Sequence, residues 1–307
     1  MLQRAGVALF LASLVFPLAV YGADADSLVA EAEAAEKARD YARARVFYER
    51  ACALGDAAGC AGFGALLLNG QGGPRDPAQA RPLFEQACDK GNLRGCNGLG
   101  LAFLWGEGGA QDKERAQALF ERACEGGEAK GCNSLGVMLA RGDGVAEDKT
   151  SARALYERAC AGGDVSGSCN NLGGMLERGD GGPPDKARAR TLYERSCEGG
   201  LAQACTSLAR MLAAGEGGAQ DEGRARSLYE SACSAGNAQG CANLGFMLAT
   251  GKGGPADKTR ARQFYEQACV GGNAVACNNL GAMFAHGDGV VEDKARARAL
   301  YEQACEG

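Results

Sequence analysis

Cysteine spacing constrains this chain more than any other feature of its sequence. Fifteen cysteines occur, and fourteen of them form close pairs whose members lie 8 residues apart, with one pair 9 apart. The pairs return every 36 residues along almost the whole chain, with a single slip of one residue. A fixed period of this length is typical of stacked supersecondary units. The sequence therefore predicts a repeat array, and not a chain folded around one closed core.

Residues 1–25 have the pattern of an export signal. Arg4 supplies the positive start, residues 5–20 form a short apolar run, and Ala23-Asp24-Ala25 gives an A-x-A cleavage site. Cleavage after Gly22 is the alternative, and an uncleaved membrane anchor is another, although the apolar run is short for a spanning helix. We expect a periplasmic or secreted protein that is a monomer and has no stable membrane span after cleavage.

Export changes the meaning of the cysteines, because regular pairs in an oxidising compartment indicate a disulfide framework. Structural zinc sites instead place cysteines two to four residues apart, and His286 is the single histidine of the chain. We therefore expect no metal and no cofactor. The predicted bridges are Cys52–Cys60, Cys88–Cys96, Cys124–Cys132, Cys160–Cys169, Cys197–Cys205, Cys233–Cys241 and Cys269–Cys277. Cys305 is expected to be unpaired, which leaves open a free thiol, an intermolecular bridge or a chain cut within the array.

Each unit has the pattern of two helices. Counting from the second cysteine of a pair as position 0, small or apolar residues fall at positions 0, 3, 4 and 7, and again at 20, 23, 24, 27 and 28. Position 4 is glycine in six of the seven units, which suggests that another helix passes close to it. Glycines at positions 10 and 12 end the first helix, and aspartate at position 16 is expected to cap the second.

This pattern resembles a known family. The stretch from Leu135 to Cys160 is similar to the Sel-like repeats, relatives of the tetratricopeptide repeats, and cysteines at the helix joint resemble the secreted, cysteine-rich Hcp-type branch. The resemblance implies an all-α, right-handed superhelical solenoid of helix-turn-helix units, here stapled by disulfides. We expect about seven repeats over residues 40–307, preceded by a capping helix over residues 26–39. It also implies a scaffold that binds proteins or peptides along a concave groove of first helices.

The side chains at positions 2, 5 and 9 of the first helices are the predicted partner-binding face. They cluster opposite the buried positions on a helical wheel and vary freely between units. The residues singled out are Leu101, Trp105, Arg141, Asn171, Arg178, Arg210, Asn243, Phe246, Asn279 and His286. They suggest an apolar end, a cationic middle suited to an acidic peptide or carboxylate, and a polar end. Unconstrained solvated surface is the competing interpretation. Asparagines also recur at position 1, where holding a peptide backbone and capping the first turn are equally good explanations.

Catalysis has little support in the residues themselves. Some cysteine-rich relatives have been assigned β-lactamase or penicillin-binding activity, and the resemblance carries that alternative here. The chain lacks an S-x-x-K motif and a K-T-G motif, and we identify no catalytic residue. Its net charge of −5 is spread without a basic stripe, so nucleic acid is not an expected partner.

Overall fold

The computed structural model describes residues 24–306, and this part of the chain consists of sixteen α-helices with no strand. The predicted all-α class and the repeating helical hairpins are confirmed. The predicted export signal lies outside the described residues except for Asp24 and Ala25. The helices are α1 (Ala25–Lys37), α2 (Tyr41–Ala53), α3 (Ala57–Asn69), α4 (Pro77–Asp89), α5 (Leu93–Trp105), α6 (Lys113–Glu125), α7 (Ala129–Arg141), α8 (Lys149–Ala161), α9 (Gly167–Arg178), α10 (Lys186–Glu198), α11 (Ala202–Ala214), α12 (Glu222–Ser234), α13 (Ala238–Thr250), α14 (Lys258–Val270), α15 (Ala274–His286) and α16 (Lys294–Glu306).

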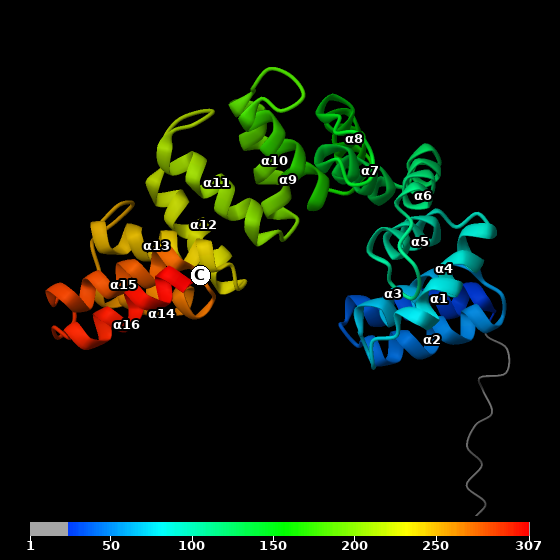
Figure 1. Cartoon of the computed structure of the whole chain (residues 1–307), viewed down its shortest axis with the longest axis horizontal. Helices are drawn as coiled ribbons and strands as arrows, with labels where there is room; N and C mark the ends of the chain where they lie inside the picture. The colour runs from blue at the N-terminus through cyan, green and yellow to red at the C-terminus, as the bar shows by residue number, and fades with distance from the viewer. Residues whose placement is uncertain (1–23, 307) are drawn as a thin grey trace, which may run out of the picture. The chain divides into compact units, whose positions relative to one another are not determined.

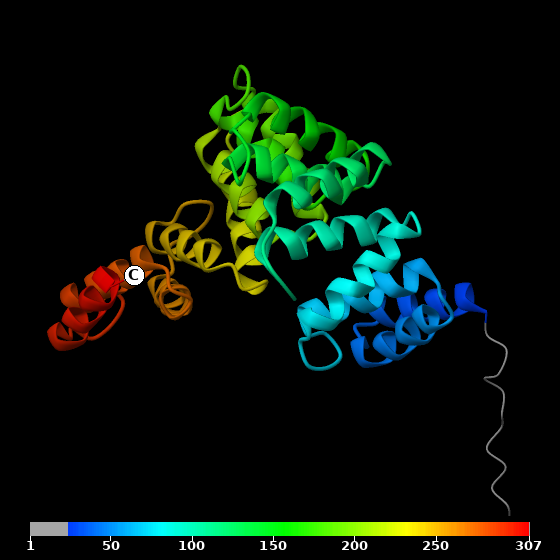
Figure 2. The same ribbon diagram turned by 45° about the vertical axis from the view of Figure 1, so that its right-hand side comes forward.

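The helices belong to two compact units, one ending at Gly95 and the other beginning at Cys96. Inside each unit, helices that follow one another in the chain pack together as hairpins, for example α1 with α2 and α15 with α16. The α15–α16 hairpin is visible at the red end of the colour scale in Figures 1 and 2. In the second unit the first helices of adjacent repeats also touch, as α7 does with α9 and α11 with α13. Their exposed side chains are therefore brought close to one another.

The predicted caps define both ends of the hairpin turn. Gly142, at position 10, ends α7 in the left-handed conformation with φ +68°, which glycine adopts without strain. Asp148, at position 16, begins α8, and its carboxylate accepts a hydrogen bond from the backbone N–H of Ser151 at 2.9 Å. The same aspartate bond recurs at the start of α10, α12 and α14. Both capping signals are local to the sequence of a single repeat.

The glycine at position 4 lies against an aromatic ring of the second helix in the same repeat. A Cβ atom added to Gly100 would stand 2.6 Å from the ring of Phe120, and one added to Gly136 would stand 2.9 Å from Tyr156. The ring at position 24 is itself buried, with Phe120 fully inaccessible. The predicted close approach is therefore that of a side chain. Only a residue without a Cβ lets the ring seat fully against the first helix.

Disulfides join a second helix to the first helix of the next repeat within each unit, as predicted. Six bridges hold their Cα atoms 4.4 to 4.9 Å apart: Cys52–Cys60, Cys124–Cys132, Cys160–Cys169, Cys197–Cys205, Cys233–Cys241 and Cys269–Cys277. Cys88 and Cys96 are disulfide-bonded as well. Closing an 8-residue loop stabilises by about 2.5 kcal/mol in the chain-entropy model. Cys305 is free and exposed.

Charged side chains of the second helices connect neighbouring repeats. Arg190 donates to the carbonyl of Ala219 at 2.9 Å, 29 residues further along the chain. Arg188 pairs with Glu157 of the preceding repeat at 2.9 Å. The pairs Arg224–Glu194, Arg260–Glu230 and Arg296–Glu266 repeat the second contact. The recurring arginines and glutamates of the second helix are thus explained by contacts between repeats.

The repeat with the 9-residue cysteine spacing is held by a hydroxyl that other repeats lack. The extra residue lies in the loop before α9, where the carbonyl of Ser166 accepts a hydrogen bond from Ser196 Oγ at 2.5 Å. Position 27 is serine here and alanine in the other repeats. Ser196 is fully buried. Its hydroxyl therefore donates a hydrogen bond to a backbone carbonyl near the insertion. The alanine that other repeats have at this position has no group that could do so.

Candidate functional site

A pocket of about 550 Å³ lies in the second unit among helices α7 to α11. Its walls include Arg141 from α7 together with Asn171 and Arg178 from α9, three of the residues predicted to bind a partner. Ser207, at position 2 of α11, also lines it. Positions 2, 5 and 9 of successive first helices therefore meet around one hollow. We call the side chains at these three positions the first-helix face.

One wall of the pocket is a set of ion pairs around Asp180. Arg178 Nε donates to Asp180 Oδ2 at 2.7 Å, and Lys149 Nζ lies 3.4 Å from Asp180 Oδ1. The hydrogen bond from Arg178 and the nearby Lys149 hold the pKa of Asp180 below its usual value, against a smaller opposing effect of burial. Both cations are thereby partly neutralised. Lys149 is further drawn to Glu147, at 3.5 Å.

Gly174, at position 5 of α9, lines the pocket without a side chain of its own. A Cβ atom at Gly174 would lie 3.2 Å from Arg178 Nη1 and 3.5 Å from the hydroxyl of Tyr193. The other repeats carry Ala, Leu, Val, Arg or Phe at this position. The sequence contained this signal, a single glycine at an otherwise variable position, although Gly174 was not among the predicted site residues.

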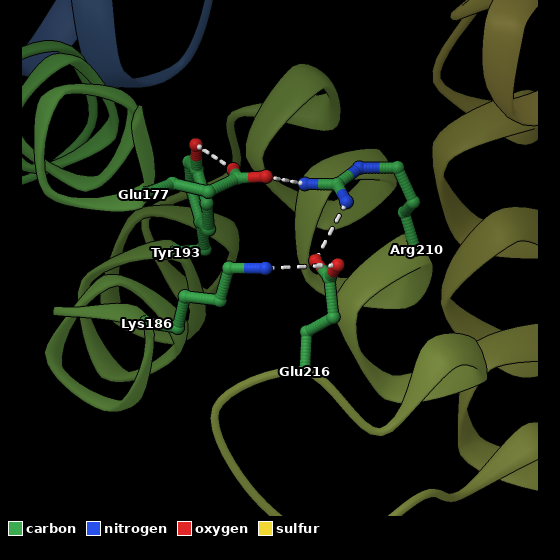
Figure 3. A network of polar contacts seen from close by, with 5 residues as sticks. All are labelled: Glu177, Lys186, Tyr193, Arg210 and Glu216. Carbon is green, nitrogen blue, oxygen red and sulfur yellow. Dashed lines mark hydrogen bonds and ion pairs between the residues drawn. The ribbon is translucent and has the colours of Figure 1, made fainter. Parts of the chain in front are cut away.

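The predicted cationic residue Arg210 is part of a closed network (Figure 3). Its guanidinium bonds to Glu177, and its Nη1 donates to Glu216 Oε2 at 2.9 Å. Glu216 also pairs with Lys186 at 3.1 Å, and Glu177 accepts a hydrogen bond from the Tyr193 hydroxyl at 3.0 Å. These cations hold the pKa of Glu216 below its usual value. The charge of Arg210 is therefore balanced by two carboxylates inside the protein.

Asn243 and Asn279, predicted for the polar end of the face, lie beside tyrosines. Burial raises the pKa of Tyr265 to about 12, and a hydrogen bond with Asn279 opposes that rise. Burial likewise raises the pKa of Tyr229, with Asn243 opposing it. Asn243 Oδ1 also accepts a hydrogen bond from Gln239 at 2.9 Å. These amides satisfy buried phenols, a structural role that the sequence pattern did not reveal.

The remaining predicted residues do not line the pocket. Trp105, at the end of α5, is 57% exposed, and Phe246, on α13, is 46% exposed. Lys252 Nζ lies over the Phe246 ring, 5.4 Å from its centre. Leu101 is partly buried on α5, and His286 is exposed at the end of α15. Two large apolar groups are thus available on the face, outside the pocket.

Within residues 24–306, no group of three or more histidine, cysteine, aspartate or glutamate side chains is arranged to hold a metal ion. No helix of that same range is long and apolar enough to cross a membrane.

The fold and the pocket place the chain among proteins built from helical-hairpin repeats. The Sel1 repeat model matches residues 35–56, 57–92, 93–128, 129–164, 166–201, 202–237, 238–273 and 274–307. The chain therefore belongs to the Sel1 repeat family, whose repeats form scaffolds that typically mediate protein–protein interaction. No curated protein matches its sequence.

Solved structures of other repeat proteins are similar. The protective antigen c5321 of uropathogenic Escherichia coli, which displays an SLR fold, is 29% identical with a TM-score of 0.71; the match covers 93% of this chain and 64% of the antigen. A Sel1 repeat protein of Oxalobacter formigenes is 24% identical with a TM-score of 0.65, over 80% of this chain and 97% of that protein. The chain thus spans less than two thirds of the length of the first of these relatives.

Proposed function

We propose that this protein is an exported scaffold that binds a protein or peptide partner through its first-helix face. The observation that carries the proposal is the pocket among α7 to α11, where variable side chains of successive first helices meet. Second-helix side chains are largely used in contacts between repeats, as Arg188 and Arg190 illustrate. Exposed Trp105 and Phe246 add apolar anchors of the kind enriched at binding hot spots.

Export is supported by the disulfides. Bonds of this kind persist in oxidising compartments and are rare in the cytosol, where thiols are kept reduced. Fourteen of the fifteen cysteines are disulfide-bonded, so the chain is suited to the periplasm or the exterior. No observation favours a β-lactam hydrolase, and that alternative is not proposed.

Site-specific photo-crosslinking tests the binding face. A photoreactive amino acid replaces Trp105 or Phe246 on first helices, and in matched proteins it replaces Glu121 or Gln303, which are exposed on second helices. We expect the two first-helix positions to crosslink the same partner in the exported fraction, and the second-helix positions to give no such adduct. Adducts that form equally from both sets, or only from Glu121 and Gln303, would refute the proposed face.

A further inference from the structure

We propose that the pocket among α7 to α11 binds a carboxylate group of the partner peptide, anchored by Arg141 and Tyr156. The inference rests on the proposed function and specifies what the central part of the face recognises. Three polar groups that line this pocket have no hydrogen-bond partner at a key atom within the described residues: Arg141, Tyr156 and Asn170.

Arg141 is the first of these groups. Within residues 24–306 its guanidinium makes no hydrogen bond and no ion pair, although Arg178 and Arg210 on the next two first helices are both paired. Arg141 and Arg178 are each followed by glycine and aspartate. Asp180 turns back to Arg178, whereas Asp143 lies 3.7 Å from Lys113 of the preceding repeat. Arg141 is therefore exposed at the edge of the pocket, and its charge is not paired with a carboxylate of the described residues.

Tyr156 is the second group. The residue is 4% exposed, and its hydroxyl makes no hydrogen bond in the described part of the chain. The hydroxyls of Tyr193, Tyr229 and Tyr265, which occupy the same position in the next three repeats, interact with Glu177, Asn243 and Asn279 respectively. Burial raises the pKa of Tyr156 to about 12, and the charge of Arg141 opposes that rise. The phenol is thus protonated at neutral pH, close to Arg141, and able to donate.

Asn170 is the third group. It lines the pocket at position 1 of α9, and its buried Oδ1 has no partner in the described residues. The other buried side-chain atom without a partner there is Oδ1 of Asn97, at the same position of α5, which does not line the pocket. A buried acceptor without a donor carries a free-energy cost. A peptide N–H that reaches this amide would supply the missing donor. Phosphate and other inorganic anions have no such N–H group.

The charge and size of the pocket agree with a peptide carboxylate. Its lining contains three cationic side chains, Arg141, Lys149 and Arg178, and one carboxylate, Asp180. A guanidinium presents two parallel N–H donors to a carboxylate, and a phenol O–H adds a third. A volume of about 550 Å³ is within the range of sites that hold small ligands. The arrangement therefore fits an acidic peptide segment better than a neutral or basic one.

Fluorescence anisotropy with the full chain tests the proposal. The probe is a fluorescein-labelled, C-terminally amidated peptide with two central glutamates, compared with the same peptide carrying glutamines. We expect the glutamine peptide to bind at least about tenfold more weakly, since it removes a charge-assisted hydrogen bond. Arg141→Gln should weaken binding of the glutamate peptide by about the same factor, and Tyr156→Phe should weaken it by roughly three- to tenfold.

Two matched variants control for general effects. Tyr265→Phe removes the same hydroxyl from another repeat, and Arg298→Gln removes an exposed arginine of α16; both should bind the glutamate peptide within about twofold of wild type. Circular dichroism of each variant checks that its helix content is unchanged. Equal binding of both peptides, equal weakening by the control variants, or displacement by inorganic phosphate as effective as by glutarate would overturn the proposal.

The source of the carboxylate is resolved by one more pair of peptides. A neutral peptide with a free C-terminal carboxyl group is compared with its amidated form, which separates capture of a chain end from capture of an acidic side chain; either result supports a carboxylate site. If the protein does not prefer the glutamate peptide but Trp105 and Phe246 still crosslink the partner, the carboxylate site alone is refuted. Loss of those crosslinks would remove the proposed function beneath it.

Discussion

At the residue scale, the contact between a glycine and an aromatic ring decides how closely the two helices of a repeat approach. The hydrogen atom of Gly100 leaves room for Phe120, which is fully buried. One repeat shows that the contact tolerates a single methyl group, since Ala209 occupies the equivalent position and is also fully buried. A branched side chain has no such tolerance, because it would displace a ring packed on every side.

Gly100→Val is expected to lower the free energy of unfolding by about 1–3 kcal/mol, the usual cost of overpacking a core. The control is Gly223→Val on α12, where a Cβ would meet no atom closer than 3.7 Å; it should change stability by less than about 0.5 kcal/mol. Urea denaturation followed by circular dichroism measures both. Equal effects of the two substitutions would show that helix propensity, and not the ring contact, governs this position.

The buried tyrosines make stability depend on alkaline pH. Burial raises the pKa of Tyr265 to about 12 and also raises that of Tyr193, whereas an unfolded phenol has a pKa of about 10. The folded state therefore keeps its phenols protonated up to a higher pH than the unfolded state does. This stabilising contribution is complete below pH of about 10 and is lost as pH rises from there towards 12.

We expect the free energy of unfolding to fall above pH of about 10 and to fall less steeply in Tyr265→Phe, which removes one titrating phenol. Urea titrations at several pH values measure the slopes, in a Cys305→Ser background that prevents exchange between the free thiol and the disulfides. Identical slopes for the two proteins would contradict this account of Tyr265.

At the element scale, paired charges link the second helix of one repeat to the turn of the next. Lys186 pairs with Glu216, and Lys258 with Asp288, each 30 residues further along. Between these two pairs along the chain, the equivalent positions carry the opposite charges. Glu222 occupies the position of the lysines, and Lys252 occupies the position of the acidic residues. Glu222 Oε2 accepts a hydrogen bond from the backbone of Gly253 at 3.3 Å. The charge of Glu222 therefore faces the segment that carries Lys252.

Glu222→Lys alone should destabilise the protein by about 0.2–1 kcal/mol, because two lysines then face one another at the joint. Lys252→Glu alone should do the same. The double variant should recover most of the combined loss, and a double-mutant cycle from thermal denaturation gives the coupling. Additive losses without recovery would mean that the reversed signs at this joint are incidental.

The same joint shows what sequence could and could not predict. Caps, turns and disulfide pairs depend on residues close in the chain, so Asp148, Gly142 and the cysteines were predictable. The role of Glu222, which stands where other repeats have Lys149, Lys186 or Lys258, was not predictable in this way, because its counterpart Lys252 lies 30 residues away. The wheel of the first helix indicated a face, and the structure places Arg141, Asn171 and Arg178 of that face around one pocket. Which arginine keeps a free charge depends on side-chain partners that no helical period reveals.

At the scale of the whole molecule, a repeat array transmits disturbance mainly to neighbours. We expect Cys160→Ala with Cys169→Ala to remove about 2.5 kcal/mol of stabilisation from the α8–α9 joint. Hydrogen exchange should accelerate in α8, α9 and the helices that touch them, and stay unchanged in α15 and α16. Cys305→Ser, which removes no disulfide, is the control. Faster exchange throughout the second unit would indicate a single cooperative core in place of independent repeats.

Hydrogen–deuterium exchange mass spectrometry of the protein with and without its crosslinked partner tests the central claim most directly, since it reports every helix in one measurement. The account predicts that binding slows exchange in α7, α9 and α11, the first helices around the pocket, and that Arg141→Gln greatly reduces this protection. Protection confined to the second helices α8, α10 and α12, or protection in α7, α9 and α11 that is unaffected by Arg141→Gln, would contradict it.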